Sequence, residues 1–350
     1  MTARLRVGML SGVRHAGQYA RLLAADPQVE LVGIAESTNA ADWMIADSKA
    51  VAASLGLPFV SGIEQFLDTE ALDMAIVCSE PTRHAALAIA ALDRSIDTLV
   101  DKPIAVTLDD AVAVARAAEA SSSRCSVVNR TYSSGLRRLR RWVDDGSLGL
   151  PLHVDVEYLS SGAHFAEAVE RPEMVIDPAL SGGGEALNFL GYAIDAVHML
   201  TGLAVVDVYA EMSCLFDFGH ARHDVEDCSV VSLLLEHGVT ATLTVGRTPA
   251  AAGYGPGSSS VRLIGSHGHA TADDDEPQVM QFGSDRLVSA HPVGGGGGAA
   301  LAGFFDDVVA SMIDGSEPRY TVRDALATMS VIDAAYRSSR DGTNVGIERA

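Results

Sequence analysis

The chain has 350 residues, a hydrophobic fraction of 48% and a formal net charge of −21. This length suits two domains, and the acidic balance argues against nucleic acid as a partner, because phosphate neutralisation needs clustered Lys and Arg. No signal peptide or apolar run long enough to span a membrane is visible. The four cysteines form no C-x-x-C pair, so we expect buried, reduced thiols in a cytoplasmic protein.

The first part of the chain alternates short apolar runs with helical patterns. Strands are expected at residues 4–10, 29–35, 59–60, 73–78, 98–100 and 126–128. Helices are expected at residues 16–23, 41–55, 84–92 and 108–120. This alternation predicts βαβ units and an α/β fold with a doubly wound parallel sheet, the Rossmann arrangement.

The pattern changes after about residue 130, where strands begin to follow one another directly. Strands are expected at residues 152–159, 205–215, 228–235, 239–245 and 261–264, with weaker ones up to 288. Helices are expected at residues 136–143, 185–200, 300–313 and 322–338, and the glycines at 294–298 predict a mobile loop. We therefore predict a Rossmann domain at residues 1–125 and an α+β domain with an open-faced, mostly antiparallel sheet at residues 126–350.

The first βα turn is where a dinucleotide-binding fold carries G-x-G-x-x-G/A. In the register set by the strand, these positions are Ser11, Val13 and Ala16, and only Ala16 fits. Taken alone, the motif fails. The position still offers a helix N-terminus that attracts anions, and Arg14 and His15 could donate to phosphate.

Two strand ends carry charged residues. Glu36 ends the second strand, where a carboxylate can accept hydrogen bonds from the adenosine ribose and would repel a 2′-phosphate; the alternative is an ordinary exposed Glu. Lys102 ends the fifth strand, where ligands bind in such sheets; the alternative is a surface Lys. Pro103 after it fixes the turn and could favour a cis bond.

The helix after three consecutive glycines carries a polar stripe. Glu185, Asn188, Tyr192 and Asp195 recur at spacings of three and four, so they share one face. The alternative is an amphipathic helix with its polar side in water. The preceding glycines indicate that the chain passes close to another group.

Together these residues resemble the Gfo/Idh/MocA oxidoreductases over essentially the whole chain. Asp101-Lys102-Pro103 is similar to the family's Glu-Lys-Pro, and residues 79–84 stand where the family has Thr-Pro-Asn and a downstream His. The three glycines open the helix that carries the family's Asp-x-Gly-x-His-x-x-Asp. Here Asn188 and Tyr192 replace the Asp and the His, and only Asp195 matches.

The resemblance implies hydride transfer between nicotinamide and a secondary alcohol or ketone of a sugar, polyol or dihydrodiol-type substrate, with NAD favoured over NADP and no metal. Lys102 would orient the substrate oxygen, Tyr192 would move the proton, and Asn188 and Asp195 would position both. A nearby ammonium favours the phenolate form of a tyrosine. The implied cofactor contacts are Ser11, Gly12, Val13, Arg14, His15, Glu36, Ser79, Glu80, Pro81, His84, Asp101, Lys102 and Asn129. The implied substrate contacts are Lys102, His164, Asn188, Tyr192 and Arg247.

Several alternatives stay open at this point. His164 and Arg247 could instead be surface or satisfied polar residues. The protein could be an NAD-dependent sugar hydrolase or lyase of the same family, or a catalytically weak regulator that binds a dinucleotide or sugar. The uncovered face of the second sheet predicts a homodimer or homotetramer in every case. The expected partner is a small molecule, with no nucleic acid and no membrane.

Overall fold

The structure is a computed structural model that describes residues 4–161, 171–248, 257–273, 278–283, 288–292 and 297–347. The chain forms two compact units. Unit 1 comprises Met1–Val128, Ala179–Gly182 and Phe304–Met329, and unit 2 comprises Asn129–Pro178, Gly183–Gly303 and Ser330–Ala350. Each unit therefore combines segments that are distant in the sequence, and the boundary expected between residues 125 and 126 stays a prediction.

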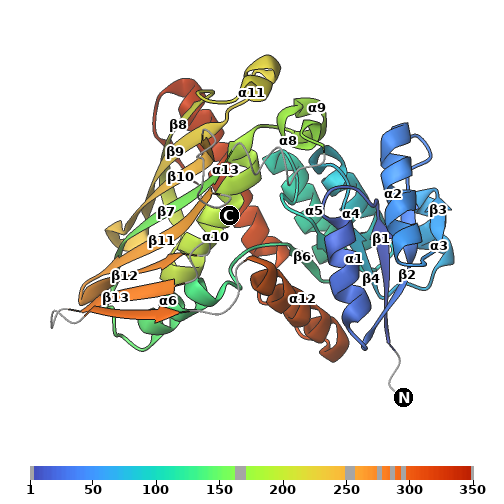
Figure 1. The fold of residues 1–350 in the computed structure, drawn as a ribbon, viewed down its shortest axis with the longest axis horizontal. Helices are drawn as coiled ribbons and strands as arrows, with labels where there is room; N and C mark the ends of the chain where they lie inside the picture. Colours follow the sequence, from blue (N-terminus) through green and yellow to red (C-terminus); the bar gives the residue numbers. More distant parts are fainter. Residues whose placement is uncertain are drawn as a thin grey trace. The chain divides into compact units, whose positions relative to one another are not determined.

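Unit 1 contains a six-stranded parallel sheet in the order β3-β2-β1-β4-β5-β6 (Figure 1). Its strands are β1 (Leu5–Leu10), β2 (Val29–Glu36), β3 (Phe59–Ser61), β4 (Met74–Val77), β5 (Asp97–Val100) and β6 (Cys125–Val127). The order reverses between β1 and β4, which is the place where ligands bind in open α/β sheets. The predicted doubly wound fold is confirmed.

Helices connect these strands. They are α1 (Ala16–Ala25), α2 (Asp42–Ser54), α3 (Ile63–Thr69), η1 (Pro81–Arg83), α4 (His84–Leu92) and α5 (Leu108–Ser121). Sequence periodicity missed α3, because seven residues are too few for a clear helical pattern. Helices α1 and α2 both pack against β2, and α4 and α5 pack against each other.

Unit 1 also includes a segment from near the end of the chain. Helices α12 (Gly297–Asp314) and α13 (Val322–Asp341) both cross the boundary between the units. Within unit 1, the ring of Phe305 packs 5.1 Å from that of Tyr19, measured between centroids. Arg124 donates to the Ser311 carbonyl at 2.5 Å. The late segment thus completes the packing of the first sheet.

Unit 2 contains a nine-stranded sheet in the order β14-β13-β12-β11-β7-β10-β9-β8-β15. Its strands are β7 (Pro151–Ser161), β8 (Val205–Ser213), β9 (Cys228–Leu235), β10 (Thr240–Thr248), β11 (Gly257–Gly265), β12 (Gly268–Asp273), β13 (Gln278–Gly283), β14 (Val288–Pro292) and β15 (Val345–Gly346). Strands β7 and β10 pair in parallel, and the other neighbours are antiparallel. The prediction of a mostly antiparallel sheet is confirmed.

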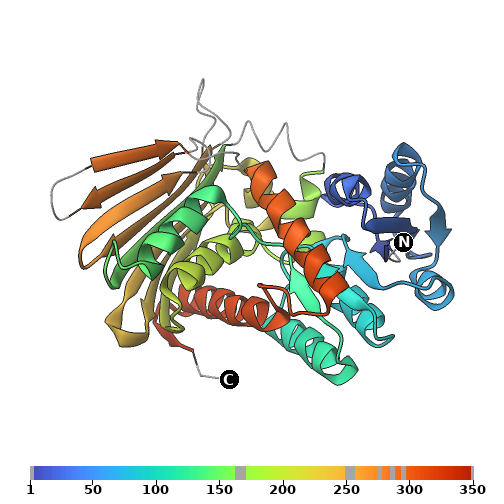
Figure 2. The same ribbon diagram turned by 90° about the horizontal axis from the view of Figure 1, so that it is seen from below.

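Helices cover one face of this sheet (Figure 2). The helices of unit 2 are α6 (Ser134–Asp144), α8 (Glu173–Ile176), α10 (Glu185–Thr201), α11 (Phe218–His223) and η2 (Glu236–Gly238), and α9 (Pro178–Ser181) lies at the unit boundary. Helix α10 packs against β7, β9 and β10. Sequence periodicity missed the short helices α8, α9 and α11, as it missed α3.

The opposite face of the large sheet carries side chains that are open to solvent. Along β9, buried and exposed residues alternate, as expected for a strand with one covered face. Val230 is 47% exposed and Leu234 is 42% exposed on the outer side. The expectation of an open-faced sheet therefore holds within unit 2.

The structure also tests the expectations for the cysteines and for the glycine run. Cys78 and Cys125 are buried, but Cys214 is exposed and Cys228 is half-buried, so the expectation of four buried thiols is wrong for these two. Residues 294–296 of the glycine run lie outside the described residues, and residues 297–298 belong to α12 rather than to a loop. In the part of the chain that the structure describes, no helix is both long enough and apolar enough to cross a membrane.

Candidate functional site

The turn after β1 packs tightly against α2. Ser11 leaves the strand with a left-handed φ of 71°. The Gly12 amide donates to Ser48 Oγ at 2.9 Å, and a Cβ on Gly12 would lie only 2.6 Å from the Ser48 Cα. Glycine is therefore required at position 12 by helix packing. Val13 is only 1% exposed, so its side chain belongs to the core and does not stand in the path of a ligand.

The turn leads into the N-terminus of α1, where Arg14 and His15 are half-buried. The amides of a first helical turn point outward and favour an anion. Because Val13 is buried, these amides and the side chains of Arg14 and His15 are the candidate donors to a phosphate at this turn. Binding of a dinucleotide pyrophosphate by these groups stays a prediction.

The Glu36 carboxylate at the end of β2 is completely enclosed. Its Oε2 accepts from Ser11 Oγ at 2.5 Å and from Ser48 Oγ at 3.2 Å. Its Oε1 accepts from the Ser37 amide at 2.8 Å and from Arg83 Nη1 at 2.9 Å. The alternative of an ordinary exposed Glu is therefore wrong. Its direct contact with a ribose stays a prediction that requires one of these four donors to move.

Arg83, in η1, connects two carboxylates. Its Nε and Nη2 donate to the two oxygens of Glu80 at 2.5 and 2.7 Å, and its Nη1 donates to Glu36 and to Ser37 Oγ, the latter at 3.1 Å. Burial works against the charge of Arg83, but the hydrogen bonds to Glu80 and Glu36 raise its pKa. The Arg83 side chain is 24% exposed, whereas the Glu36 side chain is not exposed at all. Arg83 is therefore the accessible member of this charged group.

Asp101 is a fully buried carboxylate at the end of β5. It accepts from His15 Nδ1 at 2.7 Å, from Tyr19 Oη at 2.8 Å and from the Lys102 amide at 2.8 Å. Burial alone would raise the pKa of Asp101, but the charge and hydrogen bond of His15 hold it well below its usual range. Asp101 thus ties α1 to the backbone of Lys102, which is half-buried and therefore not a surface lysine.

His84 holds the next loop in place. Its Nδ1 lies 2.6 Å from the Pro103 carbonyl oxygen and its Nε2 lies 3.0 Å from that of Ser79. Burial lowers the pKa of His84, and a neutral ring donates to one of the two oxygens. The Lys102–Pro103 bond is cis, as the sequence suggested.

Most of the expected cofactor contacts in unit 1 are enclosed by protein. Gly12, Val13 and Pro81 are buried, and six polar residues have exposed fractions that do not exceed 5%: Ser11, Glu36, Ser79, Glu80, His84 and Asp101. In this structure their polar atoms form hydrogen bonds within the loops at the carboxyl edge of the parallel sheet. Asn129, at the start of unit 2, is also buried, and its Oδ1 accepts from the Thr131 amide at 3.0 Å.

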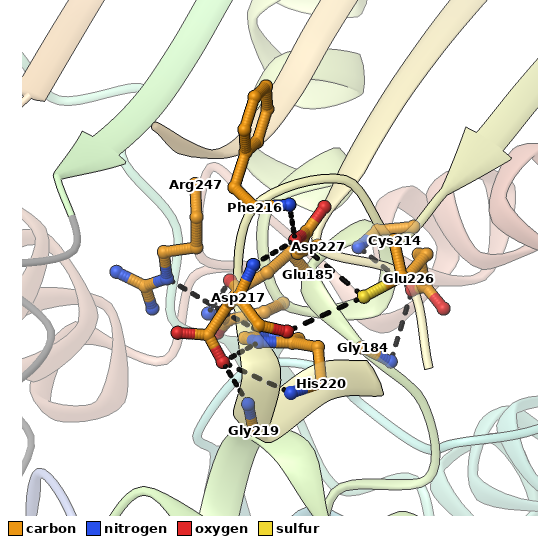
Figure 3. A network of polar contacts seen from close by, with 12 residues as sticks. Gly184, Glu185, Cys214, Phe216, Asp217, Gly219, His220, Glu226, Asp227 and Arg247 are labelled. Atoms are coloured by element: carbon orange, nitrogen blue, oxygen red, sulfur yellow. Dashed lines mark hydrogen bonds and ion pairs between the residues drawn. The ribbon is translucent and has the colours of Figure 1, made fainter. Parts of the chain in front are cut away.

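Unit 2 holds a second polar cluster, centred on Glu185 at the start of α10 (Figure 3). Glu185 Oε1 accepts from Arg247 Nε at 2.8 Å and faces His220 Nε2 at 3.1 Å. Its Oε2 accepts from Asn188 Nδ2 at 2.8 Å. Burial alone would raise the pKa of Glu185, but hydrogen bonds from His220 and Asn188 and the charge of Arg247 hold it below its usual value. Arg247 is 4% exposed, so it is not a surface residue.

His220, in α11, lies between two carboxylates. Its Nδ1 is 2.9 Å from Asp217 Oδ1, and Nε2 faces Glu185. Carboxylate oxygens only accept, so the ring satisfies both neighbours only as the imidazolium. Burial lowers the pKa of His220, but the hydrogen bonds to Glu185 and Asp217 outweigh it and raise that pKa.

The loop that carries α11 has its own anchor. Asp227 is fully buried and accepts from three consecutive amides, those of Leu215, Phe216 and Asp217, at 2.6 to 2.9 Å (Figure 3). Asp217 in turn caps α11 by accepting from the Gly219 amide at 2.7 Å. These bonds fix the position of His220.

The glycines before α10 allow a close backbone approach, as the sequence suggested. A Cβ on Gly184 would lie 2.1 Å from the Glu226 carbonyl oxygen, and one on Gly183 would lie 2.7 Å from Tyr336 Oη. Glu226 Oε1 accepts from the Gly184 amide at 3.0 Å and from Tyr336 Oη at 2.6 Å. The start of α10 is thus fixed against α13 and the segment before β9.

The polar stripe of α10 is mostly buried, so the alternative of a water-facing stripe is wrong. Glu185, Tyr192 and Asp195 are at most 9% exposed, and Asn188 is half-buried. The guanidinium of Arg130 lies 4.6 Å from the centroid of the Tyr192 ring.

The structure brings together Asn188 and Arg247 through Glu185, and it groups the expected cofactor residues of unit 1 at the carboxyl edge of the parallel sheet. His164 lies outside the described residues. Sequence reasoning missed the roles of Arg83, Glu185, His220 and Arg130. Only Glu185 gave a signal, as a member of the polar stripe. Among the described residues, no group of His, Cys, Asp and Glu could hold a metal ion.

Comparison with protein families finds two adjoining matches. Residues 5–129 match an oxidoreductase family described as an NAD-binding Rossmann fold, and residues 136–271 match the GFO/IDH/MocA C-terminal domain.

Three distant relatives match nearly the whole chain. An inositol 2-dehydrogenase of Rhizobium meliloti (strain 1021) is 22% identical, over 98% of this chain and 99% of the relative. The solved aldose-aldose oxidoreductase of Caulobacter crescentus superposes with a TM-score of 0.80 at 21% identity, over 98% of this chain and 99% of that one. A levoglucosan dehydrogenase in complex with NADH and levoglucosan gives a TM-score of 0.86 at 17% identity, over 99% and 100%. At this identity the solved structures show a shared fold.

Proposed function

Since the chain belongs to the Gfo/Idh/MocA oxidoreductase family, we propose that it is an NAD-dependent dehydrogenase or reductase of a sugar or polyol. The observation that carries the proposal is the carboxyl edge of the parallel sheet. There Asp101 fixes the backbone of Lys102, and α1 presents its N-terminus with Arg14 and His15. The named relatives act on inositol, aldoses and levoglucosan, which supports a polyhydroxylated substrate.

The cofactor supplies the hydride chemistry at the nicotinamide, and the protein supplies binding, orientation and proton transfer. The α1 N-terminus, Arg14 and His15 would hold the pyrophosphate, and the group around Glu36 would meet the adenosine. Lys102 would donate to the reacting oxygen of the substrate.

By its spacing from Asn188 and Asp195, Tyr192 would take the position of the family's His and would give or accept the hydroxyl proton. Asn188 and Asp195 would bind substrate hydroxyls or position Tyr192. Asn188 is itself held by Glu185 through its amide nitrogen. If Lys102 and Tyr192 serve the same oxygen, their substitutions should be non-additive in kcat/KM.

The decisive experiment has two parts. Mass spectrometry of the purified, denatured protein detects released NAD(H) or NADP(H), and a panel of sugars, polyols and dihydrodiols is then assayed for NADH formation at 340 nm. Oxidation of at least one substrate supports the proposal. Turnover without net change in NADH would favour a hydrolase or lyase instead. Dinucleotide binding without turnover on any substrate would favour a regulator.

We propose further that the chain forms a homodimer or homotetramer through the outer face of the large sheet. The exposed Val230 and Leu234 on β9 support this. Light scattering coupled to gel filtration gives the mass. Val230→Glu together with Leu234→Glu should lower it, and a monomeric mass for the unmodified protein would refute the proposal.

A cytoplasmic location is also proposed. The described cysteines are all free, including the exposed Cys214, which suits a reducing compartment. Fractionation of cells that express the tagged protein tests this directly.

A further inference from the structure

The charged group at the end of β2 departs from the usual pattern of dinucleotide-binding folds. There, a carboxylate at this position accepts hydrogen bonds from the adenosine ribose. Here, both oxygens of Glu36 already accept two hydrogen bonds each from the chain itself, and the residue has no exposed surface. A carboxylate offers about four acceptor positions, so Glu36 has none to spare.

Arg83 donates hydrogen bonds to this carboxylate and to Ser37, the first residue after β2. In dinucleotide-binding folds, residues at this strand end contact the 2′ position of the adenosine ribose. An arginine has five N–H groups. In Arg83 they face both Glu80 oxygens, Glu36 Oε1, Ser37 Oγ and, at 3.6 Å, the sulfur of Met44. The edge of the guanidinium is therefore occupied.

We propose that Arg83, with its edge held by Glu80 and Glu36, determines cofactor selectivity, and that Glu80 is the residue that keeps Arg83 from binding a 2′-phosphate. This inference rests on the proposed NAD-dependent function. Two carboxylates against one guanidinium leave a net negative charge beside the ribose. A phosphate would have to displace a bidentate Glu80, the strongest kind of guanidinium pairing.

The proposal makes Arg83 a latent phosphate site. Without the charge of Glu80, two N–H groups of Arg83 become available to a 2′-phosphate in the bidentate arrangement that arginine prefers. Glu80→Gln keeps the size of the side chain and removes the charge. Glu64→Gln is the matched control, because Glu64 also pairs with an arginine of unit 1, Arg94, but is 70% exposed.

The test is calorimetric titration with two probes, ADP and adenosine 2′,5′-bisphosphate, and with NAD⁺ and NADP⁺. The unmodified protein should bind ADP more tightly than adenosine 2′,5′-bisphosphate, and NAD⁺ more tightly than NADP⁺. Glu80→Gln should improve binding of the 2′-phosphorylated probes by about tenfold or more, since a hydrogen bond to a charged group contributes that much. The effect on ADP should be small. Glu64→Gln should leave the affinities for all four ligands unchanged. The double variant Glu80→Gln with Arg83→Met should lose the improved binding of the 2′-phosphorylated probes.

The outcomes separate the two proposals. The deciding quantity is the ratio of the Kd for NADP⁺ to the Kd for NAD⁺. If ADP and NAD⁺ bind but this ratio is the same in Glu80→Gln as in Glu64→Gln, the selectivity inference is wrong and the proposed function stands. If the unmodified protein binds none of the four probes, the proposed function fails and the inference fails with it. Thermal unfolding of each variant controls for folding. Should Glu80→Gln not fold, Arg83→Met, which leaves Glu36 and Glu80 without their shared cation, must increase the preference for NAD⁺ over NADP⁺; a weaker preference would refute the inference.

Discussion

Glu185 pairs with two buried cationic side chains, so its charge should matter strongly to the stability of unit 2. Glu185→Gln keeps the shape of the side chain but leaves Arg247 and His220 without their shared carboxylate. Removing one partner of a buried ion pair costs about 3–5 kcal/mol. Because Gln retains one acceptor oxygen, we expect the lower end, about 3 kcal/mol. For a unit in the range of 150–250 residues, this corresponds to a fall in Tm of about 6–12 °C.

The pH dependence gives an independent check. The pKa of His220 is raised above its usual 6.5, so its contribution to stability is complete below pH 6.5 and is lost as pH rises through the higher folded value. The pKa of Glu185 is lowered from 4.5, so its contribution is present above pH 4.5 and is lost as pH falls. The unmodified unit should therefore gain most from this cluster between pH 4.5 and 6.5. Glu185→Gln should flatten that profile.

Differential scanning calorimetry at several pH values measures both effects. Glu157→Gln, at an exposed position on β7 of the same unit, is the matched control. A Tm for Glu185→Gln within the range of that control, with an unchanged pH profile, would refute the reasoning about a buried charge cluster.

Three further substitutions test other parts of the structure. Tyr192→Phe should lower kcat by about 10² to 10⁴ if Tyr192 transfers the proton, with dinucleotide affinity unchanged in calorimetry; near-full turnover would disprove that role. Val13→Gly should weaken the fold by about 2–4 kcal/mol in chemical denaturation and should not tighten dinucleotide binding, because the Val13 side chain is buried in the core; tighter binding would show that the side chain obstructs the ligand. Gly184→Ala should prevent normal folding or lower Tm steeply, because its Cβ would lie 2.1 Å from the Glu226 carbonyl oxygen; an unchanged Tm would contradict the described backbone approach.

The fold could largely be predicted because both sheets and the long helices leave periodic patterns. Alternating strands and helices gave the parallel sheet, and consecutive strands gave the open-faced one. Short helices leave no such pattern, and α11, with six residues, is an example. The sequence did not predict that β7 and β10 pair in parallel. The relative direction of two strands depends on how they pair and not on their local sequence.

The candidate site could be located from the sequence but its contacts could not. The polar stripe of α10 was visible, yet the partners of Glu185 come from α11 and β10, far away in the chain. Glu36 was predicted to face a ribose because its position at a strand end suggested it. The spacing of residues does not predict that Arg83, 47 residues later in the chain, donates a hydrogen bond to this carboxylate.

The late segment of unit 1 bears on how the protein is made. Residues up to Val128 leave the ribosome long before Phe304–Met329, which belong to the same compact unit. Until then Tyr19 lacks the ring of Phe305, Arg124 lacks the Ser311 carbonyl and Ser126 lacks its acceptor at Tyr320. All strands of the first sheet are then present, but their packing remains incomplete while nearly all of unit 2 is translated. A chain truncated before residue 304 would be expected to lose the N-terminal unit, although the missing residues are at the opposite end of the sequence.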